Sequence, residues 1–240
     1  MTKLANLDRV VHQKLRVRDE LAQSVCRSIT MCAASLGEIP RLVIEYPLAF
    51  TKNPETGEFV SVVLFGVDPT QNLYWRDDRW NSDVVPLNVA RQPFAVATAA
   101  VEGNTNLVPC IDVENPGVQD AAGELLFDEQ GKETPYLKYK LSVLAELVEG
   151  EQQARRFAAR LAELGLIRPI QLEIKAPGAE PRKITGLHSI DEPKLRALDG
   201  ATLAELSTNG YLHAAYSMLS SLTHLQILAR RTASAGKAAH

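Results

Sequence analysis

Apolar and polar positions change their spacing near Thr134. Before this residue, short apolar or β-branched runs are separated by turn residues, a pattern that predicts strands. We expect strands at 28–34, 46–50, 59–67, 72–75, 94–101 and 107–113, with a helical turn at 38–44. The turn Asn53-Pro54-Glu55-Thr56-Gly57 joins two of these runs into a hairpin. Strands so close in sequence favour an antiparallel sheet over parallel strands joined by helices.

Beyond Thr134 the apolar spacing becomes helical. Thr134 can cap a helix whose first residue is Pro135. One apolar stripe follows at helical spacing, formed by Leu137, Leu141, Leu144 and Val148. Gly150 predicts an interruption, after which a second helix runs to a Schellman ending at Gly165 and Leu166. The segment is therefore expected to form two helices in an α-hairpin.

Strand character returns in two alternating segments, 170–175 and 183–190, which the turn 176–181 joins into a second hairpin of the sheet. Asp191 then caps a short helix, and Thr202 with Glu205 forms a capping box for the next, which ends at Asn209-Gly210. The fold class that follows is α+β, a single domain with a mainly antiparallel sheet and a helical C-terminal third. We expect this domain over residues 1–231 and a flexible tail over 232–240.

The last helix, expected over 211–231, is apolar on more than one side. Its main stripe is expected to bury Ala215, Leu219, Leu222 and Leu225. Four further apolar residues fall outside the narrow stripe: Leu212, Met218, Ile227 and Leu228. A helix that is apolar nearly all round must be covered nearly all round. Either the rest of the chain covers it, or a homodimer or protein partner does so, and we favour the interface.

Composition is that of an ordinary soluble globular protein, with 45% hydrophobic and 23% charged residues among 240 and a formal charge of −3. No basic stripe is present, so we expect no nucleic-acid partner. The N-terminus has no signal-peptide pattern, and no stretch approaches the roughly 20 apolar residues of a membrane-spanning helix. Three cysteines cannot all pair, which suits a reducing compartment. We expect a cytoplasmic protein without a membrane span, with export by another route left open.

The standard catalytic and nucleotide-binding motifs are missing from the sequence, so no catalytic residue is assigned and no cofactor is expected. His213 and His224 lie eleven residues apart on the last helix, roughly 16 Å along its axis and too far apart to share a metal ion. The segment 127–131 lacks the alternating oxygen ligands of a calcium loop. We therefore expect no metal site.

Four residues are candidate ligand-binding positions: Trp80, Arg91, Asp112 and Asp128. Trp80 ends the charged and aromatic stretch 74–80, which could stack on a sugar ring or another planar ligand, or fold back over the core as a polar turn. Arg91 precedes a buried strand, and its planar guanidinium suits a carboxylate such as Asp112, Asp128 or Glu129. This contact would be an internal ion pair, which we favour, or part of an anion or carbohydrate pocket.

A series of short motifs follows one another through most of the chain. Residues 42–66, LVIEYPLAF-TKNPETGEF-VSVVLFG, combine a Tyr-Pro-aliphatic-x-Phe strand, a polar turn and a strand that ends in Phe-Gly. The later blocks contain Asn72-Leu73-Tyr74, Trp80, Val85-Pro86, Arg91-Gln92-Pro93-Phe94, Phe127–Gly131, Thr134–Leu137, Gly186–Leu198 and Gly210-Tyr211-Leu212 with Tyr216 and Ser221-Leu222. In content and order these blocks resemble the SapC family of bacterial proteins.

The resemblance implies kinship but no reaction, because the family has no settled biochemical activity. Genes of this family tend to occur beside outer-membrane uptake receptors, halogenase-like proteins and cupin-like proteins. The resemblance thus implies a non-catalytic accessory or binding protein that acts with uptake receptors or in a modification pathway. It does not extend to the peptide-transporter permease that shares the name.

Two alternatives come from other classes. The first is an enzyme of unrecognised type with a carboxylate, arginine and histidine pocket around Arg91, Asp112 and His188. The second is a component associated with a bacterial surface layer, after which the family is named. A small polar or sugar-like ligand is compatible with the accessory protein and with the enzyme.

Overall fold

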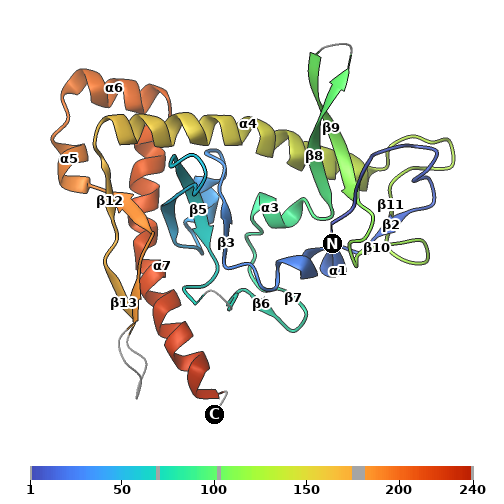
Figure 1. The fold of residues 1–240 in the computed structure, drawn as a ribbon, viewed down its shortest axis with the longest axis horizontal. Coiled ribbons are helices and arrows are strands. Elements are labelled where there is room, and N and C mark those ends of the chain that lie inside the picture. The colour runs from blue at the N-terminus through green and yellow to red at the C-terminus, as the bar shows by residue number, and fades with distance from the viewer. Residues whose placement is uncertain (1, 69–70, 102–103, 175–181, 239–240) are drawn as a thin grey trace. The chain divides into compact units, whose positions relative to one another are not determined.

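The computed structural model describes residues 2–68, 71–101, 104–174 and 182–238 (Figure 1). Every strand pairing among these residues is antiparallel. Among the described residues after Thr134, four helices begin, namely α4 (Pro135–Glu163), α5 (Glu192–Arg196), α6 (Gly200–Thr208) and α7 (Tyr211–Ala238). The predicted α+β fold class, with its antiparallel sheet and helical C-terminal third, is confirmed.

Within this fold the chain forms two compact units. Unit 1 comprises residues 1–27 and 75–149, and unit 2 comprises residues 28–74 and 150–240. Each unit is built from two separate stretches of sequence. The predicted domain limits, 1–231 with a tail over 232–240, remain a prediction.

Unit 2 contains the largest sheet, whose five strands lie in the order β12-β15-β4-β5-β3. The strands are β3 (Met31–Ala33), β4 (Leu48–Lys52), β5 (Phe59–Leu64), β12 (Ile167–Pro169) and β15 (His188–Ile190). β4 and β5 form the predicted hairpin, with Leu48 opposite Val63 and Lys52 opposite Phe59. The Asn53 side chain accepts hydrogen bonds from the amides of Glu55 and Thr56, which shapes the turn as the sequence predicts.

The second predicted hairpin is interrupted halfway along its length. β12 pairs with β15 near the sheet, whereas β13 (Leu172–Ile174) and β14 (Arg182–Ile184) form a separate two-stranded arm. Between these pairs the two strands contribute unequal numbers of residues, 170–171 against 185–187, and Gly186 adopts a positive φ of 85°. The predicted turn at 176–181 lies outside the described residues.

Helices of unit 2 cover this sheet. α2 (Ile39–Leu42) is the predicted helical turn, and just before it the Glu38 side chain accepts a hydrogen bond from the amide of Ser35. Asp191 caps α5 as predicted. The predicted capping box at Thr202 is wrong: Asp199 caps α6 and accepts hydrogen bonds from the amides of Ala201 and Thr202. Thr202 thus lies inside the first turn of the helix.

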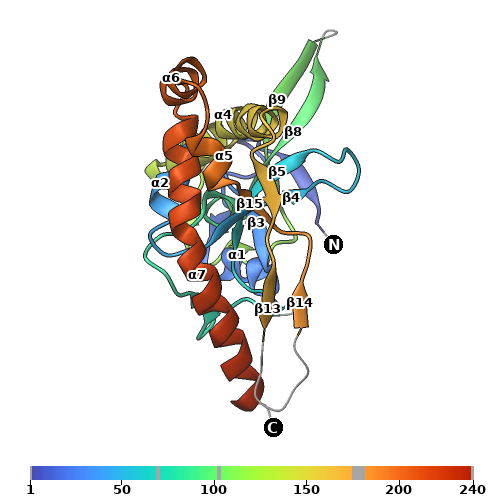
Figure 2. The same cartoon turned by 90° about the vertical axis from the view of Figure 1, so that its left-hand side faces the viewer.

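α7 packs along β4, β15, α2 and α6 (Figure 2). Its buried face is formed by Ala214, Ala215, Met218, Ser221, Leu225, Leu228 and Ala229. Ser221 accepts a hydrogen bond from the amide of Leu48, which ties the helix to β4. Met218 and Leu228, which were predicted to lie outside the stripe, are therefore covered by unit 2 itself, and Leu219 and Leu222 are half-buried.

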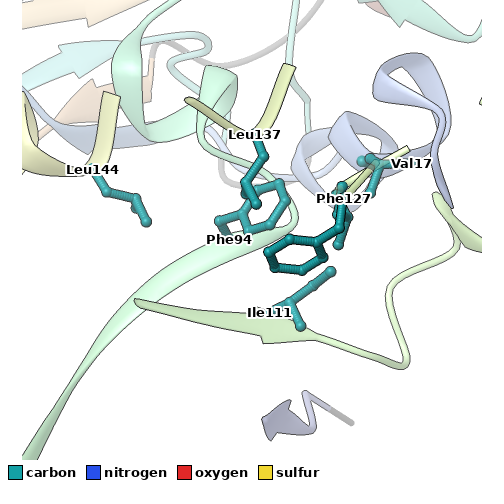
Figure 3. Packing of buried hydrophobic residues seen from close by; sticks show 8 residues of the cluster. Val17, Phe94, Ile111, Phe127, Leu137 and Leu144 are labelled. Atoms are coloured by element: carbon teal, nitrogen blue, oxygen red, sulfur yellow. The ribbon is translucent and has the colours of Figure 1, made fainter. Parts of the chain in front are cut away.

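Unit 1 contains three small sheets, with strand orders β1-β9-β8, β10-β2-β11 and β6-β7. Their strands are β1 (Leu4–Asn6), β2 (Arg16–Val17), β6 (Trp75–Arg76), β7 (Arg79–Trp80), β8 (Phe94–Val101), β9 (Asn104–Asp112), β10 (Val118–Gln119) and β11 (Glu124–Leu125). Short helices connect them: α1 (Asp19–Gln23), η1 (Ser24–Cys26) and α3 (Leu87–Ala90). The core brings Phe94, Ile111, Phe127, Leu137 and Leu144 together (Figure 3).

α4 is one uninterrupted helix of 29 residues, so the predicted α-hairpin with a break at Gly150 is wrong. Its beginning agrees with prediction, since Thr134 accepts a hydrogen bond from the amide of Leu137. Its Schellman ending also agrees, because the amide of Leu166 donates to the carbonyl of Leu161 and Gly165 has a φ of 64°. Gly150 has a different role: a Cβ there would lie 2.5 Å from the Cβ of Ser35. The glycine allows close packing rather than a turn.

Candidate functional site

Trp80 lies on β7, in a hairpin of minimal length. Asp77 and Asp78 form its two-residue turn with φ angles of 51° and 56°, as a type I′ turn requires. Trp75 stands directly opposite Trp80 in this hairpin, and Trp80 is buried. A ligand-binding role for Trp80 stays a prediction, and its burial favours the alternative in which the aromatic side chain covers the core.

Arg91 follows α3 and is half-buried. Its guanidinium donates hydrogen bonds to Asn88 Oδ1 at 3.0 Å and to the carbonyl of Phe94 at 2.7 Å. These contacts hold the arginine against the start of β8, with a cis bond between Gln92 and Pro93 in between. The predicted ion pair with a carboxylate of the 112–129 region stays a prediction.

The two candidate carboxylates shape their own turns. Asp112 ends β9 and accepts hydrogen bonds from the amides of Lys3 and Glu114. Its own amide donates to the carbonyl of Pro93, which brings its backbone beside the segment that follows Arg91. Asp128 accepts hydrogen bonds from the amides of Gln130 and Lys132. The turn predicted at 127–131 is therefore present.

A cluster that was not predicted lies in the same unit and is centred on Lys140 of α4. The lysine side chain is only 1% exposed, and its ammonium has three hydrogen-bond acceptors. These are the carbonyls of Ala90 and Gln92, at 2.6 and 3.2 Å, and Asp19 Oδ1 at 2.9 Å. The Tyr136 hydroxyl donates to the same Asp19 oxygen at 2.6 Å. An ammonium has three N–H bonds, so all the donors of Lys140 are used.

Burial dominates the electrostatics of this cluster. Desolvation lowers the pKa of Lys140, while the Asp19 carboxylate opposes that change. The pKa of Tyr136 is raised, first by burial and then by its hydrogen bond to Asp19. Burial also raises the pKa of the Cys26 thiol to about 11, and the Arg91 charge opposes this effect. Lys140 and Tyr136 therefore connect α4 to α1 through Asp19, and Lys140 connects α4 to α3 through the carbonyl of Ala90.

The sequence did contain a signal for Lys140. Positions 137, 140 and 144 are spaced by three and four residues, so Lys140 occupies the apolar face that Leu137 and Leu144 define. A lysine on such a face is either exposed at its edge or buried with a partner. Its partner Asp19, 121 positions earlier in the sequence, could not be read from that spacing.

Unit 2 has a cleft of about 560 Å³ at the interruption of the second hairpin. It is lined by Pro169, Ile170, Gln171, Glu173, Lys183, Ile184, Thr185, Gly186, Leu187 and His188. His188 packs edge-on against the Phe59 ring with centroids 5.0 Å apart. Its Nδ1 atom is buried, and no hydrogen-bond partner is found for it among the described residues. Glu173 and Lys183 stand opposite each other in the adjoining arm.

His224 has a structural contact. His224 Nε2 lies 3.1 Å from the carbonyl oxygen of Val43, and Ser220 donates to the carbonyl of Tyr216. These contacts hold α7 against α2 and cap its own turns. Among residues 2–68, 71–101, 104–174 and 182–238, no group of three or more His, Cys, Asp or Glu side chains is arranged to hold a metal ion.

The fold and its sites define an α+β protein with a fully hydrogen-bonded buried lysine in unit 1 and a cleft beside His188 in unit 2. The sequence pattern of the SapC family matches residues 7–228, and the chain belongs to this family. Neither the comparison with curated proteins nor that with solved structures found a match. In the part of the chain that the structure describes, no helix combines the length and apolar content needed to cross a membrane.

Proposed function

We propose that this chain is a non-catalytic accessory protein that acts by binding another protein through the outer face of α7. The observation that carries this proposal is the exposure of large apolar side chains on a helix whose inner face is already packed. Tyr216 is 39% exposed and Ile227 is 42% exposed. Both lie away from the buried face that contains Met218 and Leu228.

These side chains share a register along the helix. Leu212 and Leu219 are half-buried, and together with Tyr216 and Ile227 they occupy positions separated by four, three and eight residues. Such spacing places them along one side of an α-helix, which is how helices present apolar anchors to a protein groove. We refer to Leu212, Tyr216, Leu219 and Ile227 as the outer stripe of α7.

The state of Lys140 supports a binding role over an enzymatic one. A catalytic lysine needs a free amine or a proton that can reach a substrate. The Lys140 ammonium instead donates to two carbonyls and a carboxylate and is almost fully buried. This arrangement favours a structural role for Lys140.

The His188 cleft supports a second, compatible element of the proposal, a small polar ligand. The Nδ1 atom of His188 is buried and has no hydrogen-bond partner among the described residues, which favours a ligand or a water that exchanges hydrogen bonds with it. Gln171 and Thr185 line the same cleft and offer further polar groups. Membership of the SapC family supports action in the cytoplasm beside uptake receptors or in a modification pathway.

The experiment compares the wild-type chain with a double variant, Tyr216→Glu with Ile227→Glu. Met31→Glu is the matched control, because Met31 is an equally exposed apolar residue of unit 2 on the edge strand β3. Light scattering tests for a second copy, and affinity capture from the native cell extract tests for a different protein.

We expect wild type and Met31→Glu to bind the same partner, whether a second copy or a different protein. The double variant should remain folded but no longer bind that partner. A wild-type chain that is monomeric and retains no stable partner contradicts the proposal. Unchanged association of a folded double variant contradicts it as well.

A further inference from the structure

Among the residues of unit 1 whose exposure is described, the most exposed large apolar ones are two neighbouring valines near the N-terminus. Val10 is 76% exposed and Val11 is 74% exposed. They lie in a turn over residues 8–14, between β1 and β2, which we call the valine turn. Single exposed apolar residues are common on protein surfaces, but an adjacent pair with this exposure exposes a continuous apolar tip.

The valine turn is held in one conformation by its own hydrogen bonds. Asp8 Oδ1 accepts from the amides of Val10 and Val11, both at 2.8 Å. His12 is buried, its Nδ1 accepts from the Asp8 amide at 3.0 Å, and its own amide donates to the Asp8 carbonyl. Leu7 and Leu15, on either side of the turn, pack against the core of unit 1. The valines are therefore presented outward by a built turn.

Basic residues flank this apolar tip along the chain. Residues 2–18 contain five basic side chains, of which Lys3, Arg9, Lys14 and Arg18 are exposed, and one acidic side chain, Asp8. The Asp8 carboxylate is engaged with the two valine amides. Along the chain, acidic residues resume at Asp19 and Glu20, while strand pairing sets Asp112 opposite Leu4 and Glu124 opposite Val17. The excess of basic residues in this segment contrasts with the whole chain, which contains 26 basic and 29 acidic residues.

We propose that the valine turn binds the surface of a lipid bilayer that contains anionic lipid. An apolar tip with basic flanks matches such a surface, because the valines can enter the headgroup region while Arg9 and Lys14 meet lipid phosphates. Binding of this kind is peripheral and needs no spanning helix. It lies in unit 1 and is independent of the outer stripe of α7 in unit 2.

The test measures co-sedimentation of the full chain with vesicles of phosphatidylcholine alone and with vesicles that contain phosphatidylglycerol. We expect binding to the anionic vesicles to be at least about tenfold stronger and to weaken as salt is raised. Two double variants test the apolar tip and the basic flanks separately: Val10→Asp with Val11→Asp, and Arg9→Glu with Lys14→Glu. Each should lower the partition coefficient on anionic vesicles about tenfold or more.

Controls match each variant. Val25→Asp changes another exposed valine of unit 1, and Lys138→Glu with Arg156→Glu gives the same net charge as the basic variant at exposed sites on α4. Both controls should bind as wild type does, and circular dichroism verifies that every variant is folded. Absence of wild-type binding to anionic vesicles overturns the proposal, and a protein partner then becomes the occupant of the turn. Equal binding to neutral vesicles, or equal loss in the controls, overturns it as well.

Discussion

At the scale of single residues, the charges buried in unit 1 are arranged as a connected group. Asp19 is the common acceptor for Lys140 and Tyr136, while the backbone of the α3–β8 connection supplies the other two acceptors for the lysine. The contributions of these contacts to the free energy of unfolding are therefore expected to be coupled and not additive.

Removing Asp19 should reveal this sharing. Asp19→Ala leaves the buried Lys140 ammonium without its counter-charge and should lower the free energy of unfolding by about 3 kcal/mol, at the low end for buried pairs because Asp19 is partly exposed. Lys140→Met should also destabilise, and the double variant should recover about 1–3 kcal/mol of the summed loss. Urea denaturation of all four proteins measures the coupling. Additive losses would show that Asp19 and Lys140 act independently.

Stability should also fall in alkaline solution. The pKa values of Cys26 and Tyr74 are raised by burial, to about 11 and about 12. Both groups stay protonated in the folded chain while they ionise in the unfolded chain. Their contribution is therefore complete below pH 9 and is lost as the pH rises through 11 and 12, up to about 3 kcal/mol for each group.

Lys140 changes stability with pH in the opposite direction. Its pKa is lowered in the folded chain, so its contribution makes stability rise with pH below the ordinary lysine pKa of 10.5. Cys26→Ala separates the thiol from these other groups. Denaturation at several pH values should show a shallower decline between pH 9 and 11 in this variant than in wild type. An identical slope would show that the thiol is not responsible.

At the scale of elements, Gly150 determines how closely α4 can lie against the segment around Ser35. The amide of Leu36 lies 3.5 Å from the Gly150 carbonyl, and the Cβ of Ser35 occupies the space that a side chain at position 150 would need. The helix tolerates a glycine at a cost of about 1 kcal/mol relative to alanine.

Gly150→Ala therefore tests two opposing effects. Helix propensity alone predicts a more stable protein, whereas the clash with Ser35 predicts a loss of about 1–3 kcal/mol, and we expect the loss. Gly200→Ala is the control, since nothing lies within 4 Å of its added Cβ. Adding Ser35→Gly should restore stability to Gly150→Ala. A stabilised single variant in thermal or urea denaturation would contradict the close contact.

The elements that sequence predicts well are those whose cause is local. Thr134 before Pro135, Gly165 after α4 and the Asn53 turn are all determined by residues within a few positions of one another. The predicted helix break at Gly150 is wrong because a glycine is needed there for close contact with Ser35, 115 positions earlier. α6 was misread for another reason: Asp199 and Thr202 are both good N-caps, and the earlier one is used.

The same distinction holds for the candidate sites. The four candidate residues lie on local elements: Trp80 in a hairpin strand, Arg91 after α3, Asp112 at the end of β9 and Asp128 in a turn. The Lys140 cluster and the His188 cleft depend on segments that are distant in sequence or on unequal strand lengths. Neither property can be seen in a single stretch of residues.

At the scale of the whole molecule, each unit is completed by two separate stretches of chain. In unit 1 the first stretch supplies β1, β2 and α1, and the second supplies the strands and helix that pair and pack with them. Removing residues 1–27 should therefore unfold unit 1 rather than trim it. Hydrogen exchange should show amides of β8 and β9 losing protection in the shortened chain. Protection equal to that of the full chain would contradict this dependence.

This interleaving has a consequence for synthesis. The ribosome releases the chain from its N-terminus at about 5–20 residues per second, and domains generally fold as complete units. Residues 1–27 emerge before the second stretch of unit 1, which ends at residue 149. The apolar side chains of Val17 and Ala22, which are buried in the finished protein, must remain uncovered during that interval. The nascent chain thus exposes apolar side chains during translation that the folded protein covers.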